Sequence, residues 1–277
     1  MPDKNHILDI MKIKEILGAL EDFAPLALQD GYDNAGLQIG LAEDAEATGA
    51  LLCLDVTENV VDEAILRGYN LIVSHHPLLF HPVKSITSSD YVGCAILKAI
   101  KHDIVIYSAH TNLDCAYGGV NFKMAEKLGL VSPRWIVPKT SYMSGGIATT
   151  AGEGVIASLP VPQTQKDFME RVKEIFNLRS LRVNTSGKEI IRKVALCGGS
   201  GAHLIPQAVE QGADAFITGE IGYHRFFGHE SDLLLMEIGH YESEQYTLEV
   251  LRDIISRKAT SMPVYMTKMQ TNPINYL

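Results

Sequence analysis

Two histidines in the chain each precede an acidic residue by four positions, at the end of an apolar, strand-like run. His110 precedes Asp114 in IVIYSAHTNLD, and His240 precedes Glu244 in LLLMEIGHYESE. The offset is the same for both residues, since 240 − 110 = 130 and 244 − 114 = 130. Imidazole nitrogens and carboxylate oxygens are common ligands of divalent transition metals. The repeated spacing therefore predicts metal binding at both positions.

A third group of candidate ligands, His75 and His76, ends the apolar run NLIVSHH. Neighbouring residues of a regular strand point to opposite faces, so both reach one site only through an irregular turn before Pro77. Four imidazoles and two carboxylates suit two cations better than one, with a carboxylate as the bridging ligand. The predicted metal ligands are His75, His76, His110, Asp114, His240 and Glu244.

Each candidate also has a structural interpretation. A histidine is commonly satisfied within a core, Asp114 could be a turn residue or helix cap, and Glu244 could complement a helix dipole. The matched spacing favours metal binding. Glu220 and His224, in TGEIGYH, are candidate catalytic residues that could move protons or support the ligands. The other histidines have no partner pattern and are expected to lie in the core, on the surface or in the N-terminal segment: His6, His81, His102, His203 and His229.

Several motifs that would indicate other chemistry are absent from the sequence. It contains no GxxxxGK[ST] phosphate loop, no GxSxG nucleophile elbow and no HExxH zinc motif. The segment GGSGAHL precedes a predicted helix, and it could cradle an anion or form a tight turn between strand and helix. Cys197 lies within an apolar run, which disfavours a role as nucleophile.

The composition is that of a globular protein. The chain has 277 residues, of which 46% are hydrophobic and 21% charged, enough for one large or two modest domains. A net charge of −9 without a basic cluster disfavours a nucleic-acid partner. The four cysteines form no CxxC and are expected to be free thiols in a reducing cytosol. No run has the length of a membrane span or the form of a signal peptide, so a soluble cytoplasmic protein is expected.

The elements that must position the candidate ligands alternate along the chain. Apolar runs typical of buried strands end near residues 56, 76 and 109, and amphipathic helical patterns cover about 11–24, 58–67, 91–102 and 120–128. A less regular, glycine-rich stretch with short strands follows at 144–154, then a helix at about 165–176. Strand and helix patterns alternate again to a long helix expected at 244–258. This alternation predicts an α/β fold with a largely parallel or mixed sheet.

An internal duplication relates two parts of the chain. ALLCLDVTENVVDEAILRGYNLIVSHH aligns without a gap to VALCGGSGAHLIPQAVEQGADAFITGE, so that Cys53 meets Cys197 and Ser74 meets Thr218 at an offset of 144. The sequence therefore predicts two similar α/β/α domains with mixed sheets, at 1–130 plus 238–277 and at 131–237. Ligands of open α/β sheets bind at the carboxyl ends of strands. We expect the two His-x-x-x-acid pairs to face one another across a crevice there.

At these residues the chain resembles the Nif-three-like dinuclear metal centre family, whose members are often labelled GTP cyclohydrolase 1 type 2 homologues. The segments that carry the resemblance are DNAGLQIG (33–40), SHHPLLF (74–80), SAHTNLD with its following GGVN (108–121), ADAFITGEIGYH (213–224), IGHYESE (238–244) and TNPINYL (271–277). The resemblance implies two intertwined α/β domains, a toroidal homohexamer and the same six metal ligands. It also implies the compact form, without the large domain that some members insert between about 141 and 192. Members often have Asp where this chain has Glu220.

Two functions are compatible with these residues. The first is a metal-dependent hydrolase with two divalent ions per subunit, in which a metal-bridged water attacks a small-molecule or nucleotide substrate, as a GTP cyclohydrolase-type reaction requires. The alternative is a non-enzymatic metal-binding assembly or scaffold, which the lack of an evident phosphate clamp favours. Imidazole and carboxylate ligands suit Zn, Fe, Mn, Co or Ni and do not distinguish among them.

Overall fold

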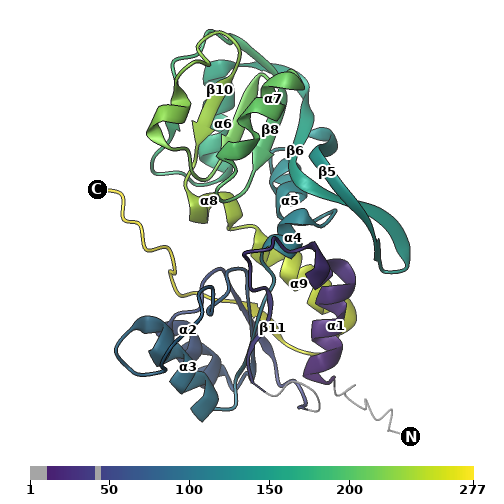
Figure 1. Ribbon diagram of the computed structural model, residues 1–277, viewed down its shortest axis with the longest axis vertical. Coiled ribbons are helices and arrows are strands. Elements are labelled where there is room, and N and C mark those ends of the chain that lie inside the picture. The colour runs from purple at the N-terminus through teal and green to yellow at the C-terminus, as the bar shows by residue number, and fades with distance from the viewer. Residues whose placement is uncertain (1–10, 41–44) are drawn as a thin grey trace, which may run out of the picture. The chain divides into compact units, whose positions relative to one another are not determined.

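The structure, a computed structural model, describes residues 11–40 and 45–277, so His6 lies outside the described residues. The chain forms two compact units. Unit 1 comprises Met1–Asn112 and Leu248–Thr271, and unit 2 comprises Leu113–Thr247 and Asn272–Leu277. Figure 1 shows the elements of each unit along the chain. The domain boundaries expected from the sequence stay a prediction.

Unit 1 is built on a five-stranded mixed sheet. Its order is β1 (Gly36–Ile39), β4 (Val105–Ser108), β3 (Leu71–Ser74), β2 (Ala50–Cys53) and β11 (Val264–Met266). All neighbouring pairs are parallel except β1 with β4. Every residue of β2, β3 and β4 is buried, because helices cover both faces of the sheet and both faces therefore carry apolar side chains.

Helices cover this sheet on both sides, with α2 (Glu58–Arg67) and α3 (Tyr91–Lys101) on one face and α1 (Ile13–Phe23) and α9 (Thr247–Lys258) on the other (Figure 1). Leu51, Ile72 and Ile106 share one apolar cluster with residues of α2 and α3. The next residue of β4, Tyr107, points the other way, and its hydroxyl donates to Glu21 of α1 at 3.4 Å. Successive side chains of a strand point to opposite faces of the sheet, so each strand packs against both layers of helices.

Local signals in the sequence set the ends of these helices. The Thr57 side chain accepts a hydrogen bond from the Val60 backbone at the start of α2, and Gly68 ends the helix with a φ of 68°. Helix α1 ends at Phe23, close to Pro25, because a residue that precedes proline is disfavoured in the helical conformation. A short 3₁₀ helix, η1 (Leu26–Leu28), follows.

Unit 2 contains a six-stranded mixed sheet. The strand order is β5 (Val131–Ser144), β6 (Ile147–Thr164), β8 (Ile190–Cys197), β9 (Ala215–Thr218), β10 (Leu234–Glu237) and β7 (Arg182–Val183). Strands β8, β9 and β10 are parallel, whereas β5, β6 and β7 pair antiparallel to their neighbours. Strand residues alternate between two apolar clusters: Leu196 and Ile217 pack with α5 (Val120–Lys127) and α6 (Gln165–Ile175), and Phe216 packs with α7 (Ile205–Glu210).

The long β5–β6 hairpin differs from the irregular glycine-rich stretch that the sequence predicted at 144–154. The strands meet at Gly145 and Gly146, whose φ angles of 55° and 81° form the turn. Trp135 fixes the pair by donating its indole N–H to the Thr150 carbonyl at 2.8 Å. The side-chain pattern here is mixed, so it gives no clear period. Backbone pairing with the neighbouring strand decides the conformation instead.

The helix expected at 244–258 is divided in two. Helix α8 (His240–Glu244) ends before Gln245, and α9 begins at Thr247. The Gln245 amide donates to the Phe176 carbonyl at 2.9 Å, and the Tyr246 hydroxyl donates to the Ile175 carbonyl. These bonds to the end of α6 hold the intervening residues outside a continuous helix. The remaining short helices are α4 (Thr111–Cys115), η2 (Ala202–Leu204) and η3 (Tyr223–Phe226).

The duplication is visible in the topology of the two sheets. Strands β2, β3 and β4 are parallel neighbours, as are β8, β9 and β10, and in each unit an antiparallel strand flanks the third. The strand registers agree: Cys53 pairs with Ser74 in unit 1, and Cys197 pairs with Thr218 in unit 2. The predicted α/β fold, with two similar domains of mixed sheets related by duplication, is confirmed. Within 11–40 and 45–277, no helix combines the length and apolar character that a membrane span requires.

An ion-pair network beside the hairpin predicts a pH-dependent stability. Lys139 Nζ lies 2.5 Å from Glu153 Oε1, and His203 Nε2 lies 3.4 Å from Glu153 Oε2. The hydrogen bond from His203 lowers the pKa of Glu153, partial burial opposes it, and Lys139 lowers it further, from 4.5 to about 2. A lowered carboxyl pKa stabilises the folded state above pH 4.5, and this contribution is lost as pH falls towards about 2.

We therefore expect Glu153→Gln to lower the free energy of unfolding by about 1–2 kcal/mol at pH 7, and by progressively less as the pH approaches 2. Urea unfolding of variant and wild type at a series of pH values measures this difference. Glu126→Gln is the control, because Glu126 forms an exposed pair with Lys123 within one helix and should matter little at any pH. A Glu153→Gln deficit that stays constant down to pH 2.5 would contradict the assignment.

Candidate metal centre

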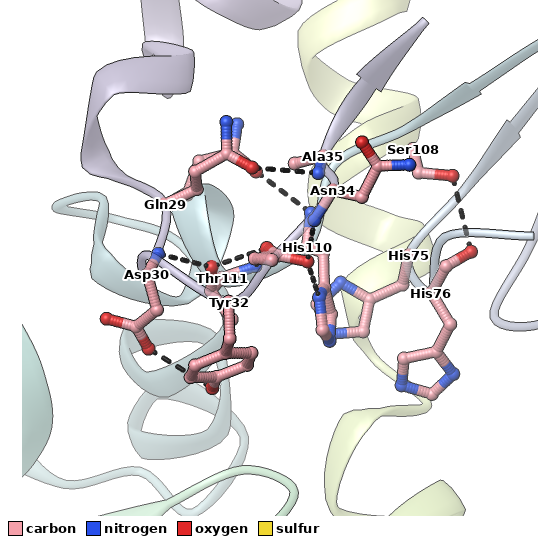
Figure 2. Close-up of polar contacts among 12 residues, drawn as sticks. Gln29, Asp30, Tyr32, Asn34, Ala35, His75, His76, Ser108, His110 and Thr111 are labelled. Carbon is pink, nitrogen blue, oxygen red and sulfur yellow. Dashed lines mark hydrogen bonds and ion pairs between the residues drawn. The ribbon is translucent and has the colours of Figure 1, made fainter. Parts of the chain in front are cut away.

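Unit 1 brings three of the predicted ligands together. His75 and His76 follow β3 and His110 follows β4, and because these strands are parallel neighbours their carboxyl ends lie at one edge of the sheet. The three side chains each offer one ligand atom, and these atoms all lie within 4.8 Å of one another. Figure 2 shows the ring of His110 close to that of His75, and their ring centroids are 5.3 Å apart.

An irregular turn lets the adjacent His75 and His76 reach the same place. Strand β3 ends at Ser74, whose hydroxyl donates to the His76 carbonyl at 2.8 Å. The backbone N–H of His76 donates to the Leu54 carbonyl at 2.9 Å, which holds the turn against the end of β2. The two imidazole centroids consequently lie 4.9 Å apart, not on opposite faces of the sheet. The irregular turn before Pro77, which both histidines need in order to reach one site, is therefore present.

Every imidazole of this group has its Nδ1 atom engaged with an acceptor. His75 Nδ1 lies 2.7 Å from the Ala109 carbonyl, His76 Nδ1 lies 2.7 Å from Asp55 Oδ1, and His110 Nδ1 lies 2.7 Å from Asp33 Oδ1. A carbonyl or an ionised carboxylate can only accept, so each Nδ1 carries the proton. In a neutral ring the Nε2 lone pair is then the ligand, which is the arrangement that metal-binding histidines use. The donor set fits a divalent cation.

Asp33 is the most constrained of these acceptors. Its side chain is fully buried, and besides His110 it accepts from the Thr111 hydroxyl at 2.5 Å and the Thr111 backbone at 3.1 Å. Burial raises the pKa of Asp33, but hydrogen bonds from His110 and Thr111 outweigh it and lower the pKa from 3.8 to about 2. The carboxylate is therefore ionised at neutral pH and fixes the orientation of the His110 ring.

Unit 2 places His240 and Glu244 on the short helix α8. His240 Nδ1 lies 2.8 Å from Glu220 Oε1, and His240 Nε2 lies 3.2 Å from Glu244 Oε2. The Glu244 side chain is only 4% exposed. Residues four apart on a helix share a face, which explains why this spacing brings imidazole and carboxylate together. Glu220, a candidate catalytic residue from the sequence, lies against His240 as Asp33 lies against His110.

Two glycines of unit 2 make room for these side chains. A Cβ atom on Gly199, whose φ is 59°, would lie 2.4 Å from Glu244 Oε1. A Cβ atom on Gly219 would lie 2.8 Å from the His240 Cα. The glycine-rich segment that follows β8 is therefore a close-packed turn beside α8, and its Gly199 N–H donates to the Ser243 hydroxyl at 2.9 Å. Of the two roles that the sequence allowed for GGSGAHL, an anion cradle or a tight turn, the structure shows the tight turn.

Asp114 lies on α4, and its backbone carbonyl accepts from the Asn121 amide at 3.1 Å. Asn121 Oδ1 in turn accepts from the Gly198 N–H at 2.9 Å, which ties α4 to the glycine turn. Burial raises the pKa of the Cys197 thiol well above its usual value, and nearby carboxylates, first that of Asp114, raise it further. Cys197 is therefore protonated at neutral pH, which agrees with the prediction that it is no nucleophile.

His224, the other catalytic candidate, is exposed on η3. Its ring lies 5.1 Å from that of Tyr223 and 6.4 Å from that of Phe227, measured between centroids. It belongs to a surface group of aromatic rings that follows Glu220 along the chain. The geometry places Glu220, and not His224, against a predicted metal ligand.

Sequence reasoning missed Asp33 and Asp55. Asp55 follows β2 as His76 follows β3, so its position after an apolar strand was a usable signal. Asp33 begins DNAGLQIG, one of the segments that carry the family resemblance, but it lies 77 positions before His110. No local spacing connects these two residues.

Comparisons with known proteins agree with this architecture. The family model described as Duf34/NIF3 (NGG1p interacting factor 3) matches residues 11–273. A protein of Clostridium perfringens named GTP cyclohydrolase 1 type 2 homolog is 35% identical over 269 residues, covering 96% of this chain and 100% of the relative. A protein of the same name from Clostridium acetobutylicum is 31% identical, covering 96% and 99%.

Solved structures show the same fold. A hypothetical protein of Staphylococcus aureus matches with a TM-score of 0.88 at 33% identity, covering 97% of this chain and 100% of the other. A Bacillus cereus protein related to NIF3 matches with a TM-score of 0.87 at 27% identity, covering 97% and 99%. Because the family model spans both units and the relatives align over nearly their full length, this chain belongs to the Duf34/NIF3 family.

Proposed function

We propose that this protein binds two divalent metal ions per chain and acts as a metal-dependent hydrolase. One observation carries the proposal: each of the four predicted histidine ligands has its Nδ1 atom within 2.8 Å of a carbonyl or carboxylate acceptor. Histidines with a purely structural role can be bonded through either ring nitrogen, so the use of Nδ1 in all four points to a shared role for Nε2. When the Nδ1 atom of a neutral ring carries the proton, its Nε2 atom is the one that would bind a metal, and this holds for all four histidines.

The proposed ligands come from both units. Unit 1 supplies His75, His76 and His110, whose ligand atoms already cluster. Unit 2 supplies Asp114, His240 and Glu244. We propose that these six residues would together hold the two divalent ions of one dinuclear centre.

Bound divalent cations would supply Lewis acidity, which is the chemistry that a hydrolase needs to activate water. Asp33, Asp55 and Glu220 hold the imidazole rings in orientation and keep Nδ1 protonated. Proton transfer by Glu220 or His224 stays part of the proposal. The name shared by the relatives, GTP cyclohydrolase 1 type 2 homolog, supports a cyclohydrolase-type reaction on a nucleotide. A toroidal homohexamer in the cytoplasm remains the proposed setting.

A second candidate is a non-enzymatic metal-binding assembly that stores or delivers metal. The charge around the histidines favours it, because three of the four, His76, His110 and His240, are bonded to acidic groups: Asp33, Asp55, Glu220 and Glu244. Such carboxylates repel the phosphates of a nucleotide and lower the affinity of the site for it unless bound cations offset them. Measured turnover distinguishes the two functions.

Elemental analysis with a hydrolase assay tests the main proposal. Protein purified without chelator should hold about two metal ions per chain. Glu244→Ala should lower that content and abolish hydrolysis, because an imidazole ligand remains but its carboxylate partner is lost. Circular dichroism checks that the variant folds. Metal content near zero in wild-type protein, even after incubation with divalent cations, would refute the site, and bound metal without turnover on any substrate would favour the second candidate.

Removal of an orienting carboxylate should weaken metal binding without removing a ligand. We expect Asp55→Ala to lower metal affinity about 10- to 100-fold, since His76 loses the acceptor that fixes its ring. Competition with a chromogenic chelator measures the affinity. Asp62→Ala is the matched control, because Asp62 pairs with Lys98 on the surface of the same unit. Equal affinities of the Asp55 and Asp62 variants would contradict the orienting role.

The close approach of Gly199 to Glu244 gives a separate test. Gly199→Ala should lower metal content, because the new Cβ atom would displace the Glu244 carboxylate. Gly68→Ala serves as control: its φ of 68° imposes a similar backbone strain of about 1 kcal/mol, yet a Cβ there meets nothing within 4 Å. Thermal unfolding checks that both variants fold, and the Gly199 variant should lose more stability because its Cβ atom also meets Glu244. Metal loss that is no greater in the Gly199 variant than in the control would exclude the proposed displacement.

A further inference from the structure

Two exposed aromatic side chains lie next to the histidine cluster of unit 1. Tyr32 is 68% exposed and Phe80 is 37% exposed. Their ring centroids are 6.4 Å apart, with an angle of 69° between the ring planes. The Phe80 ring also meets the ring of His110 nearly edge-on, at 5.9 Å between centroids and 84°. The aromatic pair is thus continuous with a predicted metal ligand.

Polar bonds hold the two loops that carry these rings. The Asn34 side chain donates to the Leu79 carbonyl at 2.8 Å, and the Leu79 N–H donates to Gln38 Oε1 at 3.1 Å. These bonds fix the residues beside Tyr32 against the residue that precedes Phe80. The rings are therefore preorganised, and a ligand that binds them loses little free energy in ordering the protein.

A second set of bonds fixes Tyr32 itself. Its hydroxyl donates to Asp30 Oδ2 at 3.2 Å, and the Asp30 N–H donates to the Thr111 hydroxyl at 2.9 Å (Figure 2). Thr111 also bonds Asp33, the acceptor for His110. One network consequently holds both the tyrosine and the ring orientation of the metal ligand.

We propose that Tyr32 and Phe80 form an aromatic corner that binds a planar heteroaromatic ring of the substrate beside His110. This inference rests on the proposed hydrolase function and names the substrate class. Two rings at 69° offer a face for stacking and an edge for a T-shaped contact to the same guest, which are the two arrangements that aromatic pairs prefer. An aliphatic ligand or a sugar gains neither.

The negative charge beside the aromatic corner further restricts the class of ring that can bind there. The carboxylate of Asp30 lies at the Tyr32 hydroxyl, and that of Asp33 lies at His110. Both carboxylates repel an anionic ring substituent. The partly exposed Asp30 carboxylate also favours a ring edge that carries N–H donors. Asp33 does not, because it is buried and engaged with His110 and Thr111. A neutral nitrogen heterocycle with an amino or ring N–H group satisfies both the shape and the charge of the corner.

Isothermal titration calorimetry of metal-loaded protein with adenosine, guanosine and cytidine tests the proposal, with ribose as the ring-free control. At least one nucleoside should bind and ribose should not. Tyr32→Ala and Phe80→Leu should each weaken that binding at least about tenfold, because the stacking contact is lost. Tyr32→Phe should keep most of it. Tyr91→Ala is the matched control, since Tyr91 is 67% exposed elsewhere in the same unit.

Metal content and oligomeric state are measured on every variant. Retained metal with selective loss of nucleoside binding supports the corner. If wild-type protein holds metal but binds no nucleoside, or if Tyr91→Ala weakens binding equally, the inference fails while the proposed metal function stands. If the wild type binds no metal, the proposed function fails first. A change of oligomeric state in the Tyr32 and Phe80 variants, without loss of binding, would assign the rings to a protein interface and overturn the proposal.

Discussion

The hydrogen bond at Nδ1 is the interaction on which the candidate metal centre depends. A free imidazole rotates and exchanges its proton between two nitrogens, so it presents no fixed ligand atom. In this chain a carbonyl fixes His75, and carboxylates fix His76, His110 and His240. The acceptors must themselves be fixed in position and stabilised. For Asp33, two hydrogen bonds from Thr111 offset the loss of hydration of its buried charge.

The two halves of the duplication place different residues at equivalent positions around the histidines. At the repeat offset of 144, Asp55 and His75 of the first half correspond to Gly199 and Gly219 of the second, because 199 − 55 and 219 − 75 both equal 144. The first half places a predicted metal ligand, His75, and a carboxylate that orients His76 at these positions. The second half places none, since a Cβ atom at either glycine would collide with α8. His76, a predicted ligand, corresponds to Glu220, which serves instead as an acceptor for His240. The repeated framework therefore carries predicted ligands in unequal number in its two copies.

Acidic groups dominate the surroundings of the histidines, and this sets the chemistry that the site can perform. Carboxylates near imidazoles favour cation binding and disfavour anions until cations offset the charge. The aromatic rings beside His110 supply contact area without charge. A substrate that suits both features has a planar, neutral portion near the ligands and any anionic portion elsewhere. The geometry of unit 1 thereby constrains which ligands the proposed site would accept.

The sequence by itself determined the α/β class, the duplication and the histidines and acids at the strand ends, because apolar period and residue spacing are local properties that each element expresses directly. The shared helical face of His240 and Glu244 came only from the structure, because the sequence placed the start of the helix at Glu244. Only the tertiary structure decided the rest. The turn that brings His75 beside His76 depends on hydrogen bonds to neighbouring strands, and the β5–β6 hairpin depends on pairing that its mixed side-chain pattern does not encode. Asp33 reaches His110 across 77 positions of sequence, and Asp55 reaches His76 across 21. Such partners meet because the ends of their strands lie at one edge of a sheet. The number of residues between them in the sequence does not predict that they are close in space.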